Sequence, residues 1–495
     1  MTEQPSLCPL ALHAIARPAA IALVEHQPQG GAILCRYDDL HHQVEQRRHW
    51  LQQQGIKPGQ RLLVAIQDQG ELLRLLIASL RLGCVLIPID PDFLQAQKHA
   101  LILGCDADGF IDESATPDPA AQSTRLDSRL LPERCFRLDL NALASIPRQL
   151  QIPTLVITHP DAPLSGVLTS GATGTPKLAL HSYNNHLASA EGSRHLIPLK
   201  PGDGWGLLLP LYHIGGQAIL FRCLLAGASL IIPAPAESRE QPLLQPLLQL
   251  LAEPRLTHLS AVPSQLLSLQ QANFNFANST LQQLLLSGAS LAPRLLRWLY
   301  QQPLQSWISY DLTEMSSQVM TGPPCASARL TSLLPHCQLR LSDENEILVK
   351  GASLFLGYYR KGRCHQPVDA QGWFHTGDLG QFDPQQQLSI GGRLDNQFIS
   401  GGENIQPETI ERALAAYPGI DECLVVPADD PGQGLRPVVF IRSQAAIDHA
   451  QLDLWLRQRL PSHQIPVRYL PMPTTTAALE PSRVEVRRLA AEPNP

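Results

Sequence analysis

The sequence predicts an α/β protein that combines a large N-terminal domain of helix-covered sheets with a small α+β lid domain at the C-terminus. Short apolar runs typical of buried strands recur along the chain, and helix-like stretches such as 71–82 and 242–252 separate many of them. This alternation favours parallel sheets covered by helices. The chain has 495 residues, more than a single core usually serves, so at least two domains are expected.

The apolar runs define the expected strands of the large domain. Their residues are 62–66, 85–89, 155–157, 207–210, 230–232 and 284–286. Residues 113–150 mix polar residues with proline and indicate a surface segment. After Gly391 the pattern changes to a compact unit, with helices expected at 407–417 and 452–460 and strands at 422–426 and 437–442. We therefore place the domain boundary at Asp395, between an N-terminal domain of residues 1–394 and a lid domain of residues 395–495.

The composition is that of a soluble globular enzyme, with 44% hydrophobic and 17% charged residues. The net charge of −6 argues against a nucleic-acid binder. No uncharged apolar run is long enough to span a membrane, and the first residues lack the pattern of a secretory signal. Ten cysteines without a Cys-x-x-Cys pair favour free thiols in a reducing cytoplasm over a metal site. Whether the protein forms a homo-oligomer stays open.

The most informative stretch runs from Thr169 to Lys177 and reads Thr-Ser-Gly-Ala-Thr-Gly-Thr-Pro-Lys. A short apolar run, 166–168, precedes it, and residues 178–182 lead from it into a helix-like stretch. Glycines let a backbone approach an anion closely, hydroxyl and N–H groups donate to the anion, and a lysine adds positive charge. No Gly-Lys-Ser/Thr closes the loop, so its spacing is not that of the Walker loop. The stretch predicts a phosphate-binding loop.

This loop resembles the signature of the adenylate-forming enzymes, the superfamily of acyl-CoA ligases, peptide-synthetase adenylation domains and luciferases. Further stretches in matching order carry the resemblance over nearly the whole chain: 310–314 (Tyr-Asp-Leu-Thr-Glu), 373–380 (with Thr-Gly-Asp), 392–395 (Gly-Arg-Leu-Asp) and 400–411. The resemblance implies that a carboxylate reacts with ATP to give an acyl-adenylate, which the thiol of coenzyme A then attacks. Both steps develop negative charge, so aimed N–H groups, cations and Mg²⁺ are expected rather than a protein nucleophile.

The resemblance also implies roles for individual residues around ATP. The phosphate loop supplies Thr169, Ser170, Gly171, Thr173, Gly174 and Lys177, while Ala172 departs from the usual hydroxyl residue. Thr313 contacts phosphate, and Glu314 holds Mg²⁺, which prefers carboxylate oxygen. The remaining nucleotide contacts are Ser287, Gly288, Tyr310, the ribose-binding acid Asp378 and its partner Arg393.

Two further positions complete this comparison. Asp395 matches the hinge about which the mobile lid swings. Asp311 replaces the glycine that the family usually carries after Tyr310. A side chain at this position affects how closely the loop can pack against the nucleotide.

One branch of the superfamily resembles the chain most, the o-succinylbenzoate–CoA ligases of menaquinone synthesis. The stretches that carry this likeness are 181–190 and 391–396, together with Phe398, 400–403 and 405–408. This branch implies an aryl carboxylate substrate with a second, retained carboxylate, which needs a cation. His213 falls in the acyl-pocket segment and is a candidate catalytic and substrate residue, Arg222 falls at the substrate-binding arginine, and Ser260 lines the pocket. A helix-surface role for Arg222 is the alternative, although its neighbours are apolar.

The largest departure lies near the C-terminus, where these enzymes usually carry a lysine that enters the site during adenylation. Aligned on Ser482 and Arg483, that position holds Glu480, and no lysine follows Lys361. A carboxylate beside ATP phosphates repels them. Three outcomes stay open: slow adenylation with Arg483 as stand-in, a homologue specialised in the thioester step, or a weakly catalytic nucleotide-binding relative. Another aryl- or acyl-CoA ligase is the alternative within the enzyme class.

Overall fold

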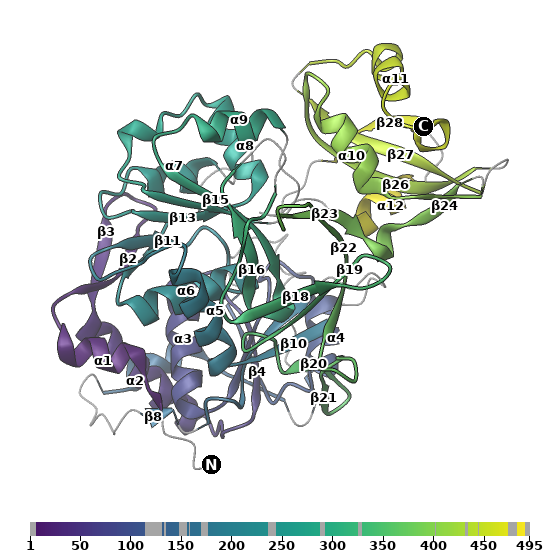
Figure 1. Cartoon of the computed structure of the whole chain (residues 1–495). Helices are drawn as coiled ribbons and strands as arrows, with labels where there is room; N and C mark the ends of the chain where they lie inside the picture. Colours follow the sequence, from purple (N-terminus) through teal and green to yellow (C-terminus); the bar gives the residue numbers. More distant parts are fainter. Residues whose placement is uncertain are drawn as a thin grey trace.

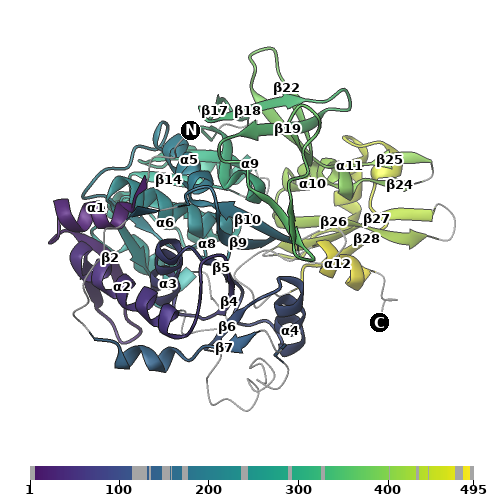
Figure 2. The same cartoon turned by 90° about the horizontal axis from the view of Figure 1, so that it is seen from below.

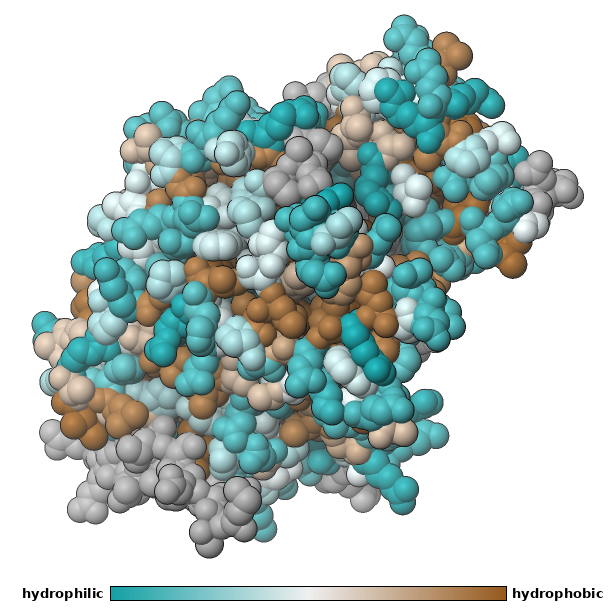
Figure 3. Space-filling view, in the orientation of Figure 1, coloured by the Kyte–Doolittle hydropathy of each residue, from teal (hydrophilic) through white to brown (hydrophobic). Residues whose placement is uncertain are grey.

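The computed structural model of the chain has a large body that carries the N-terminus and a small unit at the C-terminal end (Figure 1). The residues it describes are 6–113, 131–132, 135–147, 156–157, 159–169, 177–235, 244–287, 293–324, 329–400, 402–430, 434–443, 445–473 and 483–490. No helix in these ranges is long and apolar enough to cross a bilayer. Hydrophilic residues cover most of the face seen in Figure 3, and hydrophobic residues are scattered between them in small groups.

The first large sheet has eight described strands in the order β21-β20-β10-β9-β5-β4-β6-β7. Its inner strands β5, β4 and β6 pair in parallel, whereas β9 and β10 form an antiparallel pair. The strands are β4 (Arg61–Ala65), β5 (Val85–Pro88), β6 (Gly109–Asp112), β7 (Phe136–Arg137), β9 (Pro163–Thr169), β10 (Lys177–Ser182), β20 (Gly357–Arg360) and β21 (Arg363–His365).

The second large sheet has nine described strands in the order β17-β16-β15-β14-β13-β11-β12-β2-β3. Strands β15 to β2 in this order pair in parallel, and antiparallel strands close both edges. The strands are β2 (Ile21–His26), β3 (Ala32–Arg36), β11 (Gly204–Gly206), β12 (Ser229–Ile232), β13 (His258–Ala261), β14 (Gln283–Leu286), β15 (Gln305–Leu312), β16 (Ser317–Gly322) and β17 (Ser332–Leu333).

Helices fill the space between the two sheets and cover their outer faces (Figure 2). One continuous core joins apolar residues of both sheets to helix α3 (Gln69–Leu82), which is buried on almost every side. Asp68 caps the start of α3, and Gly83, at φ +79°, ends it in the left-handed conformation that glycine adopts easily. The other helices of the body are α1 (Pro9–Ala16), α2 (Tyr37–Gln53), α4 (Gln95–Gly104), α5 (Tyr183–Arg194), α6 (Ile214–Ala226), α7 (Leu244–Leu251), α8 (Pro263–Gln271) and α9 (Pro293–Tyr300).

A four-stranded antiparallel sheet follows along the chain, in the order β18-β19-β22-β23. Its strands are β18 (Cys337–Leu341), β19 (Glu346–Gly351), β22 (Phe374–Phe382) and β23 (Leu388–Arg393). A short 3₁₀ helix, η6 (Leu394–Asn396), leads out of β23. The chain then enters a different sheet, and the described residues after η6 have apolar cores of their own.

This C-terminal sheet packs helices against its faces and projects from the body in Figure 1. Its strand order is β25-β24-β27-β26, with β28 paired to β27. The elements are β24 (Phe398–Ser400), β25 (Glu403–Ile405), α10 (Pro407–Ala415), β26 (Ile420–Asp430), β27 (Gly434–Ser443), α11 (His449–Arg457), β28 (Arg468–Pro471) and α12 (Arg483–Ala490). The expected α/β class, with a smaller α+β unit at the C-terminus, is confirmed.

One predicted strand is wrong, and another lies outside the large sheets. Residues 207–210 are not a strand; the strand is β11, which ends at Gly206, and the chain then turns toward helix α6. Leu207 and Leu209 are buried in an irregular segment, so the apolar run reports their burial and not a strand. The run at 155–157 is described only as β8 (Val156–Ile157), which pairs with β1 (Ser6–Leu7) outside the large sheets.

Candidate active site

The acid predicted to bind ribose, Asp378, is held by two donors. Strand pairing sets Asp378 on β22 opposite Arg393 on β23. Arg393 Nη1 donates to Asp378 Oδ1 over 2.8 Å, and the Tyr310 hydroxyl donates to Oδ2 over 2.6 Å. Burial raises the pKa of the Asp378 carboxyl, whereas the charge of Arg393 and the Tyr310 hydrogen bond lower it. The carboxylate is therefore fixed in direction, and each oxygen still has a lone pair for a further hydroxyl.

The lysine at the end of the phosphate loop and the predicted magnesium ligand meet at one tyrosine. Tyr358 on β20 donates its hydroxyl to Glu314 Oε1, and the Lys177 ammonium lies 5.1 Å from the centroid of the Tyr358 ring. Because β20 pairs with β10, at whose start Lys177 lies, this contact follows from the sheet register. A cation and an acid that are 137 positions apart in the sequence thus share one aromatic neighbour.

The donor set around Glu314 suits magnesium bound through substrate. Within the described ranges, no group of three or more His, Cys, Asp and Glu side chains lies close enough to hold a metal. Mg²⁺ is usually held by one or two carboxylates together with substrate phosphates and waters. A single carboxylate opposite the end of a phosphate loop fits that mode of binding.

The turn that carries Thr313 and Glu314 is strained and firmly held. Ser316 and Ser317, which follow it, have φ angles of +54° and +120°, where a side chain is unfavourable. The Ser189 hydroxyl donates to the Ser316 carbonyl over 2.8 Å, and His181 Nε2 donates to the Thr313 carbonyl over 2.8 Å. Strain of this kind costs about 1–3 kcal/mol per residue and gathers at functional sites.

The two predicted substrate residues Arg222 and Ser260 come together around Trp205. Arg222 on α6 is 4% exposed, and its guanidinium carbon lies 5.1 Å from the centroid of the Trp205 ring. The Trp205 indole donates through Nε1 to Ser260 Oγ over 3.2 Å. Arg222 is therefore a buried residue, and the helix-surface alternative is wrong.

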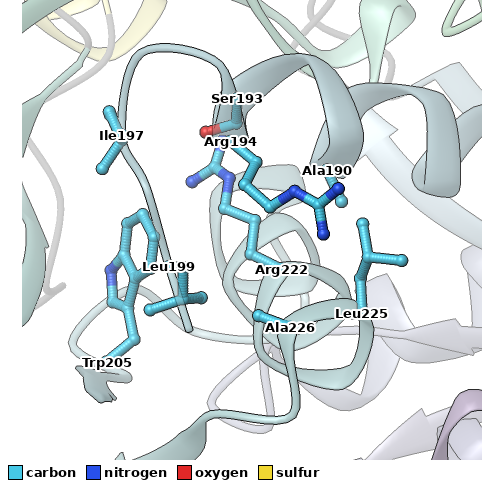
Figure 4. Close-up of a pocket in the computed structure, with 9 residues that line it drawn as sticks. All are labelled: Ala190, Ser193, Arg194, Ile197, Leu199, Trp205, Arg222, Leu225 and Ala226. Carbon is cyan, nitrogen blue, oxygen red and sulfur yellow. The ribbon is translucent and has the colours of Figure 1, made fainter. Parts of the chain in front are cut away.

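A small cavity adjoins this cluster (Figure 4). Its volume is about 10 Å³, and α5, α6 and the segment leading into β11 contribute its lining. A space of this size holds about one water molecule and is too small for an aryl acid. The residues that line it are Ala190, Ser193, Arg194, Ile197, Leu199, Trp205, Arg222, Leu225 and Ala226.

His213 lies at the start of helix α6, as its N-cap residue. Burial lowers the pKa of its imidazole to about 4, so the ring is neutral near pH 7. Its Nε2 is buried and finds no hydrogen-bond partner among the described residues. A buried ring nitrogen without a partner is suited to a polar group of a ligand.

Some of the predicted nucleotide-binding residues lie in the described part of the chain, and others lie outside it. Thr169 and Lys177 are described and face each other across the β9–β10 pair. Ser287 follows β14, and its side chain bonds to Asp311 and lowers the pKa of that carboxyl. Outside the described residues lie Ser170, Gly171, Thr173, Gly174, Gly288 and Glu480.

Residues 11–359 match the family described as AMP-binding enzyme. The chain belongs to this family. This AMP-binding enzyme is 36% identical over 424 residues, 85% of each chain, to the 2-succinylbenzoate–CoA ligase of Salmonella typhimurium. It is 34% identical over 425 residues, again 85% of each chain, to the protein of that name from Escherichia coli.

Solved structures agree with this assignment. Wild-type E. coli MenE with a bound m-phenylether-linked analogue of OSB-AMS is 30% identical and has a TM-score of 0.75, with 98% of this chain and 99% of that chain covered. The Bacillus subtilis o-succinylbenzoate coenzyme A synthetase in complex with ATP and magnesium ion has a TM-score of 0.82 over 98% of this chain and all of that chain. At 22% identity this second likeness concerns the fold. The expected membership of the adenylate-forming superfamily and the likeness to its o-succinylbenzoate branch are confirmed.

The predicted hinge residue of the AMP-binding enzyme lies on the surface. Asp395 pairs with Arg393 over 3.3 Å, and both side chains are nearly half exposed. Such a pair contributes about 0–1 kcal/mol to stability. Two contacts cross from the C-terminal unit to β23: Gln406 Nε2 donates to the Arg393 carbonyl, and Arg412 Nη2 donates to the Gly391 carbonyl, both over 3.0 Å.

Arg483, considered above as a stand-in for the absent lysine, is engaged inside the C-terminal unit. Its guanidinium donates to Glu411 Oε2 over 2.8 Å, to Glu408 Oε1 over 3.2 Å and to the Val425 carbonyl over 2.6 Å. A cation with three such acceptors ties α12 to α10 and β26. In this conformation it is a structural ion pair.

Sequence reasoning missed several residues of the site. Tyr358, Trp205 and His181 reach the site through sheet register or helix packing, and no spacing in the sequence relates them to their partners. Ser317 and Gln318 were detectable in part, because they follow the Thr-Glu pair directly. Their contact with Arg222, about 95 positions away, is purely tertiary.

Proposed function

We propose that this chain activates an aryl carboxylate, 2-succinylbenzoate, with ATP and transfers the acyl group to coenzyme A, a step of menaquinone biosynthesis. In the first half-reaction a carboxylate oxygen attacks the α-phosphorus of ATP, and the bond to pyrophosphate breaks. In the second, the thiol sulfur of coenzyme A attacks the acyl carbon, AMP leaves, and the thiol proton is released. The enzyme is an AMP-forming acid–thiol ligase that uses ATP, Mg²⁺ and coenzyme A.

The proposed nucleotide site is built on Asp378. Its oriented carboxylate accepts from the ribose hydroxyls, and Arg393 and Tyr310 hold it in place. Lys177 and Thr313 donate to the phosphates. The loop residues from Thr169 onward and the segment at Ser287 supply the remaining contacts with the nucleotide. Glu314 would hold Mg²⁺, which would supply positive charge beside the phosphates.

The proposed acyl pocket rests on a single observation, the buried guanidinium of Arg222. Arginine is rarely buried without a charged partner within reach, and the bonded partners of Arg222, Ser317 and Gln318, are neutral. A desolvated cation with neutral neighbours suits the retained carboxylate of a diacid. Ser260 completes this end of the pocket, and His213 lines it through its unpartnered Nε2.

We also infer that the change of sheet after Arg393 is the domain boundary. Residues 1–394 then form the adenylation domain, and residues 395–495 form a lid that pivots at Asp395. The weak surface pair between Arg393 and Asp395 offers little resistance to such a motion. A cytoplasmic location and a homo-oligomeric state stay predictions.

The test is pyrophosphate release and thioester formation with ATP, coenzyme A and a panel of aryl acids. We expect 2-succinylbenzoate to be preferred over benzoate, which has no second carboxylate. Arg222→Gln should raise the KM for the diacid more than tenfold and leave the KM for ATP unchanged, since a desolvated charge pair is worth about 2–5 kcal/mol. Arg194→Gln is the matched control, because the exposed Arg194 lines the same small cavity.

Other outcomes separate the alternatives. Preference for a monocarboxylic acid, with no effect of Arg222→Gln on KM, would assign the chain to another aryl- or acyl-CoA ligase activity. Nucleotide binding without pyrophosphate release from any acid would identify the weakly catalytic homologue that Glu480 suggests.

A further inference from the structure

Arg222 is a buried cation that forms no direct ion pair with an acid among the described residues. Its Nη2 donates to Gln318 Oε1 over 2.9 Å and to Ser317 Oγ over 3.3 Å, and its Nε has no hydrogen-bond partner in the described part of the chain. Burial lowers the pKa of Arg222 to about 10, and the charge of Asp311 acts in the opposite direction. A charge buried in this way needs a compensating charge nearby.

Strand register brings Asp311 close to the same cluster. Strands β15 and β16 pair so that Asp311 lies opposite Gln318 and Ser309 lies opposite Thr321. Directly opposed residues of an antiparallel pair project to the same face of the sheet. The side chain of Asp311 and the side chain that binds Arg222 are therefore neighbours.

A continuous chain of hydrogen bonds joins the two charges. The Ser309 hydroxyl donates to Asp311 Oδ1 over 2.7 Å, and Ser309 Oγ lies 3.3 Å from Thr321 Oγ1. Gln318 Nε2 donates to Thr321 Oγ1 over 3.0 Å, and its Oε1 accepts from Arg222. Because the Ser309 proton is used on Asp311, Thr321 must donate to Ser309. Every link then points from the cation toward the anion, and links aligned in this way strengthen one another.

We propose that Asp311 is the internal counter-ion of Arg222, connected to it by the relay Gln318–Thr321–Ser309, and that it sets how strongly Arg222 attracts the retained carboxylate of the substrate. The inference rests on the proposed acyl pocket. It also gives a role to the acid that stands where related enzymes usually carry glycine. Asp311 acts through Arg222 and is therefore a positioning residue.

Two consequences follow from this charge balance. In the empty enzyme Asp311 stabilises the buried cation, so its removal lowers stability. In the complex the substrate carboxylate and Asp311 share one cation, so removal of the Asp311 charge tightens binding of the diacid. Burial raises the pKa of the Asp311 carboxyl, and hydrogen bonds from Ser309 and Ser287 together with the charge of Arg222 lower it. Burial therefore opposes the ionised form that the relay requires, and Ser309, Ser287 and Arg222 are the groups that favour it.

The first test is a double-mutant cycle on the melting temperature of the ligand-free full-length protein, which needs no catalytic activity. Asp311→Asn should lower the melting temperature when Arg222 is present. In the Arg222→Gln background the same change should raise it, because a lone buried acid is then removed. A non-additive shift of about 2–4 °C is expected, the effect of one ~1 kcal/mol interaction in a large domain. Additive shifts would overturn the proposal.

The second test is kinetic and compares a variant that removes the Asp311 charge with one that keeps both charges and interrupts the relay. Asp311→Asn should lower the KM for 2-succinylbenzoate about threefold to tenfold, with the KM values for benzoate and ATP unchanged. Thr321→Val interrupts the relay with little change of shape and should shift the diacid KM in the same direction by less. Should Asp311→Asn fail to fold, Thr321→Val carries the test alone. An unchanged diacid KM in the folded variants would refute the relay. If the Asp311 and Arg222 substitutions are non-additive in melting temperature but the protein has no activity on the diacid, the proposed substrate is rejected and the ion pair between Asp311 and Arg222 is retained.

Discussion

Tyr310→Phe tests the proposed ribose site by removal of a single hydroxyl. Tyr310 is almost fully buried, and its hydroxyl lies 2.6 Å from Asp378 Oδ2. The change removes one of the two described donors to that carboxylate and leaves the ring in place. A hydrogen bond to a charged group is worth about 1.5–3 kcal/mol, so the dissociation constant for AMP should rise about tenfold or more.

The pH dependence of AMP binding gives an independent measure. The ribose hydroxyls need the ionised carboxylate, so binding is lost as the pH falls through the pKa of Asp378. Burial raises that pKa, and the Tyr310 hydrogen bond lowers it. Removal of the hydroxyl should therefore move the acidic loss of binding to higher pH.

The assay is calorimetric titration of AMP into the full-length protein without Mg²⁺ across a pH series. Tyr358→Phe is the matched control, because it removes a hydroxyl from Glu314 instead. The control should impair Mg²⁺-dependent pyrophosphate release and spare AMP binding. Equal AMP affinity for Tyr310→Phe and the unaltered protein, with superimposable pH curves, would refute the placement of ribose at Asp378.

Two further predictions concern the lid. Glu480→Lys should speed adenylation about tenfold or more, since each ~1.4 kcal/mol is a factor of ten, and should leave thioester formation from supplied acyl-adenylate unchanged. Single-turnover rates of each half-reaction measure this. Equal adenylation rates in the variant and the unaltered protein would mean that the segment around Glu480 does not enter the site. Asp395→Pro, which fixes φ at the proposed hinge, should impair one half-reaction more than the other. Equal losses together with weaker ATP binding would point to direct contact between Asp395 and the nucleotide.

The sequence determined the fold class and the family of this protein. Glycine, hydroxyl and lysine residues in a fixed local order define a phosphate loop. Such a loop can be recognised from the sequence because the residues that bind the same ligand are adjacent in the chain. The Thr-Glu pair and the Gly-Arg-Leu-Asp stretch are local in the same sense. The strand expected at 207–210 is wrong because hydrophobicity reports the burial of Leu207 and Leu209, which an irregular segment after β11 also provides.

Only the tertiary structure decided how the separate motifs combine. Lys177 and Glu314 share Tyr358 because β10 pairs with β20, and Asp378 and Arg393 pair because β22 lies beside β23. The sequence marked Asp311 as a departure without assigning it a partner. Its link to Arg222 arises from the register of β15 and β16, which sets Asp311 opposite Gln318. Hydrogen bonds and charge pairs act over a few ångströms in space, so partners far apart along the chain are fixed by packing and strand register, which local residue patterns do not encode.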